Sequence, residues 1–277
     1  MKRTQRLALC VGAAILFAGS GLAAAPAKAP AKAAVAQKAP AKPAAKAAPL
    51  AMPSPAEARA ALEKGLLTIP VYPVIKEYYP DVYATIIKTA LDGYLNGHSI
   101  LSMQMEIRGA YLPLLKRQMP KAEPQLVYNM IGISREESEA LIGSPGACMA
   151  FLGLGTFTQR PDQLIAPDVA KRELQLTADI LRQTATRPYA YDPARVAQAP
   201  SAQSLAMNAY DELPSDDSRK RFTAMAGQFA AAKDPADQRV VCEYMVGFFS
   251  ALLKQTPEDA AATFVGATAK PAAPAGS

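Results

Sequence analysis

The stretch "PADQRVVCEYMVGFFSALLKQ", residues 235–255, is the most apolar amphipathic segment of the chain. Asp234 offers an oxygen acceptor to the free N–H groups of a helix start, and proline suits the first helical position. Large apolar side chains then recur at the three- and four-residue spacing of one helix face. They are Val240, Val241, Tyr244, Met245, Phe248, Phe249 and Leu252. The stretch predicts a helix at the centre of the core.

The same arrangement of cap, proline and acid recurs along the chain. "SPAE" at 54–57 and "SREE" at 134–137 have the spacing of a capping box, and "TPED" at 256–259 repeats the cap, proline and acid order. Each pattern places an oxygen acceptor against unpaired N–H groups and a carboxylate at the positive end of the helix dipole. We therefore expect helix starts at these three places.

Apolar periodicity predicts further helices. From Pro80, "PDVYATIIKTALDGYL" places an apolar stripe along one face, ending at Leu95. Pro113 should kink or end the helix that Ser99 opens. Other helices are expected from Glu123, Ser144 and Pro167, and over 202–213 and 216–232. No convincing alternating strand pattern appears. The sequence predicts an all-α fold, an irregular bundle of about eight to ten helices.

The positive charge of the chain is unevenly distributed. The net charge is +6, yet all 24 acidic residues lie between Glu57 and Asp259. Nine of the 30 basic residues lie outside this region, so the body carries 21 basic residues and a net charge of −3. A nucleic-acid-binding domain carries its positive charge on the fold itself. We therefore expect no nucleic-acid partner.

The N-terminus has the pattern of a secretory signal peptide, residues 1–23. A basic "MKRTQR" precedes an uncharged apolar run rich in small residues. Cleavage is expected after Ala23 or Ala24, because Pro26 would obstruct a cut after Ala25. The alternative is a retained anchor, although the run is near the lower length limit for spanning a bilayer. Leu9 is too large to precede a lipidated Cys10.

Residues 24–53, the basic stretch, consist almost entirely of Ala, Pro and Lys. Such a composition cannot bury enough apolar surface to offset its ordering entropy, so we expect an extended tether. The tether is a spacer or an electrostatic attachment to anionic lipid head groups or acidic wall polymers. The tail, 266–277, has a similar composition. The helical domain is expected over 54–265, with a possible subdivision near 186–200. No internal repeat appears.

After leader removal two cysteines remain, Cys148 and Cys242. An even number in an oxidising compartment favours a disulfide, and two buried free thiols are the alternative. The protein is expected to be periplasmic or secreted.

The search for catalytic residues is mostly negative. His98, the single histidine, precedes a predicted helix and fits an exposed or capping role. One histidine and two separated cysteines do not build a usual zinc site, so no metal is expected. No cofactor motif is present, and no cofactor is expected. Glu136 and Glu137 are interpreted as first-turn acids, as are Asp216 and Asp217. No catalytic residue is assigned.

Four tyrosines, Tyr72, Tyr78, Tyr79 and Tyr83, lie close together in "VYPVIKEYYPDVY" and are split by prolines. Tyrosine is both apolar and hydrogen-bonding, which suits a binding surface. The alternative is that these rings pack the first helices together.

Two functional hypotheses follow. The first is an exported, non-catalytic helical protein of the cell envelope that binds an envelope protein or an anionic envelope polymer. Membrane contact would then be weak electrostatics or a retained signal anchor. The second is a hydrolase that acts on wall or extracellular polymer through carboxylates far apart in sequence. The first is preferred, because the constellations of polar side chains that catalysis needs are missing.

Overall fold

The computed structural model describes residues 54–158, 163–225 and 227–269. The predicted signal peptide, the basic stretch and the tail from residue 270 lie outside these ranges. Within the described residues the regular elements are α-helices and short 3₁₀ turns, with no strand. The all-α prediction is confirmed.

The described part of the chain contains twelve α-helices, slightly more than the expected eight to ten. They are α2 (Pro55–Leu66), α3 (Val71–Tyr78), α4 (Pro80–Leu95), α5 (Ile100–Gln118), α6 (Pro124–Leu141), α7 (Pro145–Phe151), α8 (Pro167–Thr186), α9 (Pro193–Gln198), α10 (Ala202–Asp211), α11 (Asp216–Met225), α12 (Pro235–Leu253) and α13 (Pro257–Ala269). The excess arises because α3 is separated from α4 at Tyr79–Pro80, and because the short α9 forms inside the expected linker.

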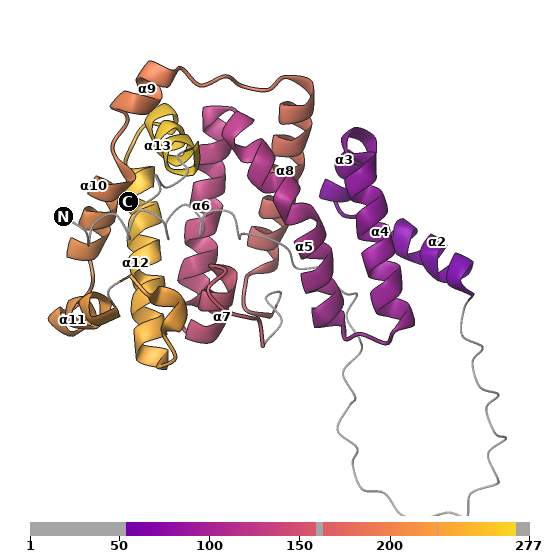
Figure 1. The fold of residues 1–277 in the computed structure, drawn as a ribbon, viewed down its shortest axis with the longest axis horizontal. Coiled ribbons are helices and arrows are strands. Elements are labelled where there is room, and N and C mark those ends of the chain that lie inside the picture. Colours follow the sequence, from indigo (N-terminus) through magenta and orange to yellow (C-terminus); the bar gives the residue numbers. More distant parts are fainter. Residues whose placement is uncertain (1–53, 159–162, 226, 270–277) are drawn as a thin grey trace, which may run out of the picture.

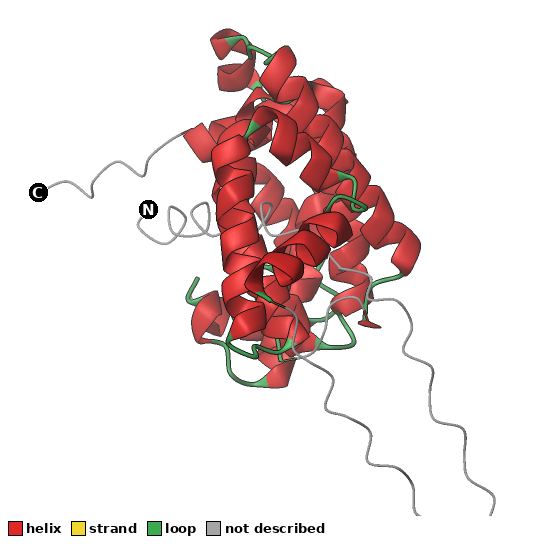
Figure 2. Ribbon diagram, turned by 90° about the vertical axis from the view of Figure 1, so that its right-hand side faces the viewer, coloured by secondary structure: helices red, strands yellow, loops and turns green. Residues whose placement is uncertain are grey.

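The helices form a broad bundle with α6 near its middle (Figure 1). Helices α12 and α13 pack against one side of α6 and α8 against another. Beyond α8 lie α3 and α5, then α4, and α2 forms the outer edge. At the opposite edge α10 and α11 cover α12. Figure 2 shows the same helices from the side at which α2 lies.

Helix α12 lies in the core as expected, and all seven apolar residues predicted for its buried face are buried. Its start is also as predicted, because the Asp234 side chain accepts a hydrogen bond from the Ala236 N–H at 2.9 Å. The capping box at Ser54 and Glu57 is present at the start of α2. At α13 the Thr256 hydroxyl accepts from the Asp259 N–H at 3.2 Å.

One local prediction is wrong, and one of the two outcomes expected at Pro113 does not occur. The "SREE" pattern does not start a helix, because α6 runs without a break from Pro124 to Leu141. Glu136 and Glu137 therefore lie inside this helix rather than in a first turn. Pro113 was expected to kink or end its helix, and it does not end α5, which continues to Gln118. In both cases the helix is longer than the local signal indicates.

The segment 186–200 runs from the end of α8 to α9 along one end of the bundle (Figure 1). It is fastened to both neighbouring parts of the fold. The Tyr191 hydroxyl donates to the Ala122 carbonyl at 2.9 Å, and Arg195 pairs with Asp259 at 3.0 Å. Buried residues from before and after this segment belong to one continuous core.

Cys148 of α7 and Cys242 of α12 face each other, with their sulfur atoms 2.18 Å apart. Both residues are fully buried. The pair therefore sits at bonding distance and connects α7 to the central α12. Each helix within the described ranges is too short or too polar to cross a bilayer.

Candidate functional site

The connection between α4 and α5, residues 95–100, is called here the α4–α5 tip. Helix α4 ends in a Schellman motif: the His98 N–H donates to the Gly93 carbonyl at 2.9 Å, and the Gly97 N–H to the Tyr94 carbonyl at 3.1 Å. Gly97 has φ +69°, the left-handed conformation that this motif requires and that glycine adopts without strain.

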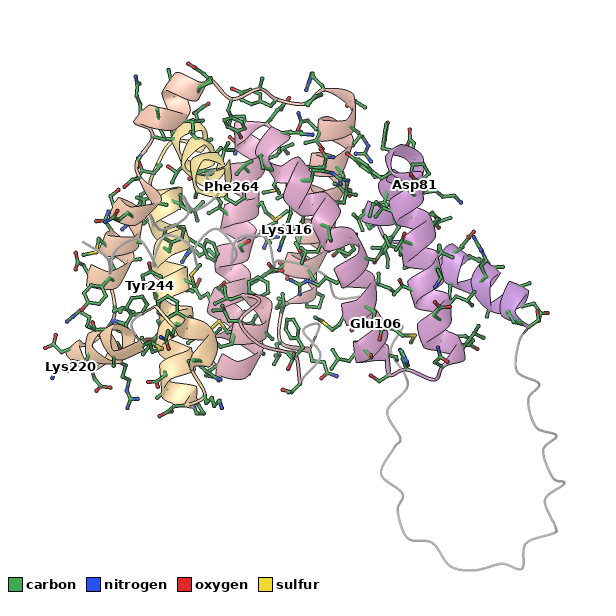
Figure 3. All side chains as sticks on the ribbon, in the orientation of Figure 1. Asp81, Glu106, Lys116, Lys220, Tyr244 and Phe264 are labelled. Atoms are coloured by element: carbon green, nitrogen blue, oxygen red, sulfur yellow. A yellow bond between two sulfur atoms is a disulfide. The ribbon has the colours of Figure 1, made fainter. Side chains whose placement is uncertain are left out.

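Side-chain hydrogen bonds stabilise the part of the tip that leads into α5. Ser99 caps α5 by accepting from the Ser102 N–H at 3.1 Å. The Glu106 carboxylate lies 3.0 Å from His98 Nδ1 and accepts from the Ser102 hydroxyl at 2.8 Å. These two hydrogen bonds, that of Ser102 most strongly, lower the pKa of Glu106. Figure 3 labels Glu106 near the lower end of α5. The tip is therefore a well-defined turn.

Two large apolar side chains are exposed on this turn. Leu95, the last residue of α4, is 46% exposed, and Ile100, the first residue of α5, is 49% exposed. The sequence pattern placed Leu95 on the buried stripe of its helix. The stripe is buried at Ile86, Ile87 and Ala90, but at Leu95 this face of α4 is left partly uncovered. The sequence analysis did not single out the α4–α5 tip.

The Gly97→Ala substitution should destabilise the protein by about 1 kcal/mol, because an L-residue pays this much in the left-handed region. No atom would contact the added methyl group, so the cost is conformational. Urea unfolding measures it. The control is Gly109→Ala in α5, also with open space around it, which should stabilise by about 0.5 kcal/mol as glycine leaves a helix interior. Equal changes in the free energy of unfolding for the two variants would contradict the Schellman motif at Gly97.

A second unusual feature is a pair of buried glutamates. Glu137 of α6 and Glu173 of α8 are each 1% exposed, and their carboxyl groups are hydrogen-bonded to each other. Arg108 of α5 is 8% exposed, and its positive charge acts to lower the pKa of both carboxyl groups. Its guanidinium also lies 5.8 Å from the centre of the Phe157 ring. Three helices thus meet around two buried carboxyl groups and one guanidinium group.

Burial determines how this pair ionises. Desolvation raises the pKa of Glu137 well above its usual range, and the negative charge of Glu173 raises it further. Desolvation also raises the pKa of Glu173, to about 7, although Arg108 opposes this rise. Both raised pKa values favour protonation of the pair, most strongly at Glu137, whose carboxyl group then donates to Glu173. Arg108 Nη2 and the Ser134 hydroxyl, one turn before Glu137, have no hydrogen-bond partner among the described residues.

An ion pair lies beside the buried pair. Arg172 of α8 binds Glu136 of α6 through both guanidinium NH₂ groups, at 3.1 and 2.5 Å. The contact between α6 and α8 therefore has an exposed ion pair and, beneath it, a buried pair of carboxyl groups. The exposed layer lowers the pKa of Glu136 through the Arg172 hydrogen bonds, the opposite of the shift at Glu137.

The four predicted tyrosines do not form one exposed ridge. Tyr72 and Tyr83 are buried, and the Tyr72 ring packs edge-on against Tyr111 of α5. Tyr79 is half-buried, and its hydroxyl donates to the Leu181 carbonyl of α8 at 3.0 Å. Tyr78 is also half-buried. Their contacts join α3 and α4 to α5 and α8.

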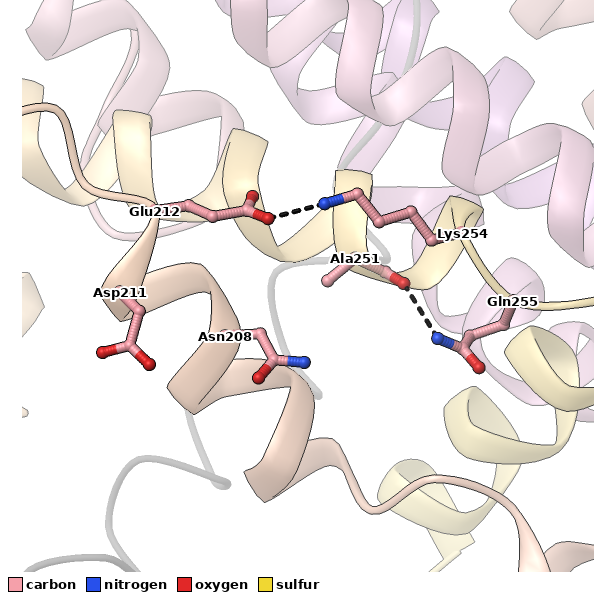
Figure 4. A pocket seen from close by; sticks show the side chains of 6 residues that line it. All are labelled: Asn208, Asp211, Glu212, Ala251, Lys254 and Gln255. Atoms are coloured by element: carbon pink, nitrogen blue, oxygen red, sulfur yellow. Dashed lines mark hydrogen bonds and ion pairs between the residues drawn. The ribbon is translucent and has the colours of Figure 1, made fainter.

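A polar hollow of about 230 Å³ lies between the ends of α10 and α12 (Figure 4). Glu212 and Lys254 form an ion pair of 2.6 Å across it, and Asn208 and Asp211 line its α10 side. A ligand would have to displace this ion pair, so the hollow gives no specific functional indication. No group of three or more metal-binding side chains gathers within the described ranges.

Comparison with known proteins adds no relative: no family model, curated protein or solved structure matches the chain.

Proposed function

We propose that this is an exported, non-catalytic helical protein of the cell envelope, which binds a partner protein or another envelope component through a tethered domain. The α4–α5 tip is the observation that carries the proposal. It presents Leu95 and Ile100 together on a turn whose backbone and polar side chains are held in place. Exposed apolar side chains gathered on a defined surface are typical of an interaction site.

Export is supported by two independent features. The first is the signal-peptide pattern of residues 1–23. The second is the pair Cys148 and Cys242, which we propose to be a disulfide, because their sulfurs lie at bonding distance and such bonds persist in oxidising compartments. Residues 24–53 are the proposed tether.

The test is envelope association in the native cell. The Leu95→Ser/Ile100→Ser variant should be released into the soluble fraction, whereas the wild-type protein should sediment with the envelope. Met207→Ser/Tyr189→Ser is the matched control, because these side chains are 46% and 41% exposed elsewhere on the body. Association that survives the tip variant would refute the role of the tip.

A carboxylate-dependent hydrolase of wall or extracellular polymer is the second candidate, favoured by the shared proton of Glu137 and Glu173. Two features make it the weaker proposal. Hydrogen-bonded carboxyls are closer than the roughly 5 to 9 Å that glycoside hydrolysis uses, and both side chains are almost fully buried. Wall-polymer hydrolysis that is lost in Glu137→Gln would favour this candidate.

A further inference from the structure

We propose that the junction of α5, α6 and α8 is a binding site for buried water, which bridges the Arg108 guanidinium to the carboxyl groups of Glu137 and Glu173. The site is separate from the α4–α5 tip and independent of the proposed function. Helix α8 packs against both α6 and α5 (Figure 1). The carboxyl pair lies between α6 and α8, and the Arg108 side chain approaches it from the third helix.

Buried polar atoms without partners are the observation behind this site. The hydrogen bond between the two carboxyl groups leaves the Oε2 atoms of Glu137 and Glu173 without a partner among the described residues. Arg108 Nη2 and the Ser134 hydroxyl are in the same condition. All four side chains are more than nine-tenths buried, so bulk solvent does not reach these atoms. Buried polar atoms are almost always hydrogen-bonded, and internal water is the usual partner where the protein offers none.

The surroundings of the Arg108 guanidinium do not supply the acceptor that Nη2 needs. Its positive charge acts on both carboxyl groups, and its central carbon lies 5.8 Å from the centre of the Phe157 ring. The face of an aromatic ring attracts the charge of a guanidinium. It does not replace an oxygen acceptor for a buried N–H group, so Nη2 still requires a hydrogen bond.

The chemistry of these atoms favours water over an ion. Arg108 Nη2 can only donate a hydrogen bond, whereas a carboxyl oxygen that carries no proton can only accept one. A molecule between them must accept from the guanidinium and donate to the carboxyl group, and water does both. A metal cation would be repelled by the guanidinium, and an anion would be repelled by an ionised carboxylate. The Ser134 hydroxyl can donate or accept, so it suits a further contact with the bound water.

A crystal structure of the protein, at a resolution that places ordered solvent, tests the proposal directly. We expect a water molecule at roughly 2.7 to 3.2 Å from Arg108 Nη2 and at a similar distance from Oε2 of Glu137 or Glu173. A direct hydrogen bond from Nη2 to either carboxyl group, with no water between them, would overturn the proposal. A junction without solvent density, or one that holds an ion, would overturn it as well.

Magnetic relaxation dispersion of the solvent gives a second measurement, because it detects water molecules that stay inside a protein for a long time. Arg108→Met/Glu137→Met/Glu173→Met replaces the three polar groups with apolar side chains, a kind of change that buried ionic clusters often tolerate. This variant should lose the contribution of at least one long-lived water. The matched control is Arg172→Met/Glu136→Met, which removes the exposed ion pair between α6 and α8 and should keep that contribution.

Circular dichroism verifies that both variants fold. A folded triple variant with the same solvent relaxation as the wild-type protein would refute the bound water. If the triple variant does not fold, the crystal structure of the wild-type protein decides.

Discussion

The free energy of unfolding is expected to fall as the pH rises from about 5 to about 8, by about 2 to 3 kcal/mol through Glu173 alone and further through Glu137. The cause is the buried Glu137–Glu173 pair, because burial raises the pKa of Glu173 to about 7 and that of Glu137 well above its usual range. In the unfolded chain both groups ionise near their ordinary pKa of 4.5. The folded state therefore binds more protons across this interval.

The direction follows from proton linkage. The contribution of the pair is fully present below about pH 4.5 and is lost as the pH rises through the native pKa of about 7. A carboxyl group with a lowered pKa contributes stability that is lost as the pH falls. The pKa values of Glu57, Glu106 and Glu136 are lowered from 4.5, so their contributions to stability change mainly below pH 4.5. They do not mask the loss between pH 5 and 8. Urea unfolding at a series of pH values measures the slope.

The double variant Glu137→Gln/Glu173→Gln keeps the shape and hydrogen-bonding capacity of the pair but removes both titrating groups. Its unfolding free energy should change little between about pH 5 and about pH 8. Glu136→Gln is the matched control, because it removes the exposed ion pair with Arg172 and should keep the wild-type slope. Wild-type stability that is constant or rising across this interval would show that the pair ionises freely.

The pair was missed because one local signal was misread. Taking "SREE" as a helix start placed Glu137 in an exposed first turn. Read as the interior of one helix, α6, the same residue falls on the stripe of Met130, Ser134 and Leu141, at spacings of three and four. Its burial could then have been predicted. Its partner could not, because Glu173 lies 36 residues away on α8 and meets it only through tertiary packing.

Local signals predicted the helices well where the cap and the apolar period agreed. The start of α12 at Asp234 and the buried face from Val240 to Leu252 are examples. Local signals failed where the packing of other helices decides whether a side chain is exposed. Leu95 continues the apolar period of α4, yet it is exposed, because periodicity shows which face a residue occupies and not whether another helix covers it.

Loss of the proposed disulfide between Cys148 and Cys242 is expected to have the largest effect of all. The two residues are 94 positions apart, so the bond closes a long loop in the unfolded chain. The chain-entropy relation gives about 4 to 5 kcal/mol for such a loop. Domains of this size are stable by about 5 to 15 kcal/mol, so the Cys148→Ala/Cys242→Ala variant should be close to unfolding at physiological temperature. Urea unfolding of the variant and of the oxidised protein measures the difference.

Chemical reduction distinguishes the effect of losing the bond from the effect of replacing the two side chains. Dithiothreitol should destabilise the wild-type protein by a similar amount and leave the double variant unchanged, since the variant has no bond to break. Thiol labelling of the denatured, unreduced mature chain should find no free cysteine, whereas a chain that retains its leader should show one, Cys10. Two labelled thiols in the mature chain would mean that Cys148 and Cys242 are only packed together, and the expected loss on reduction would then disappear.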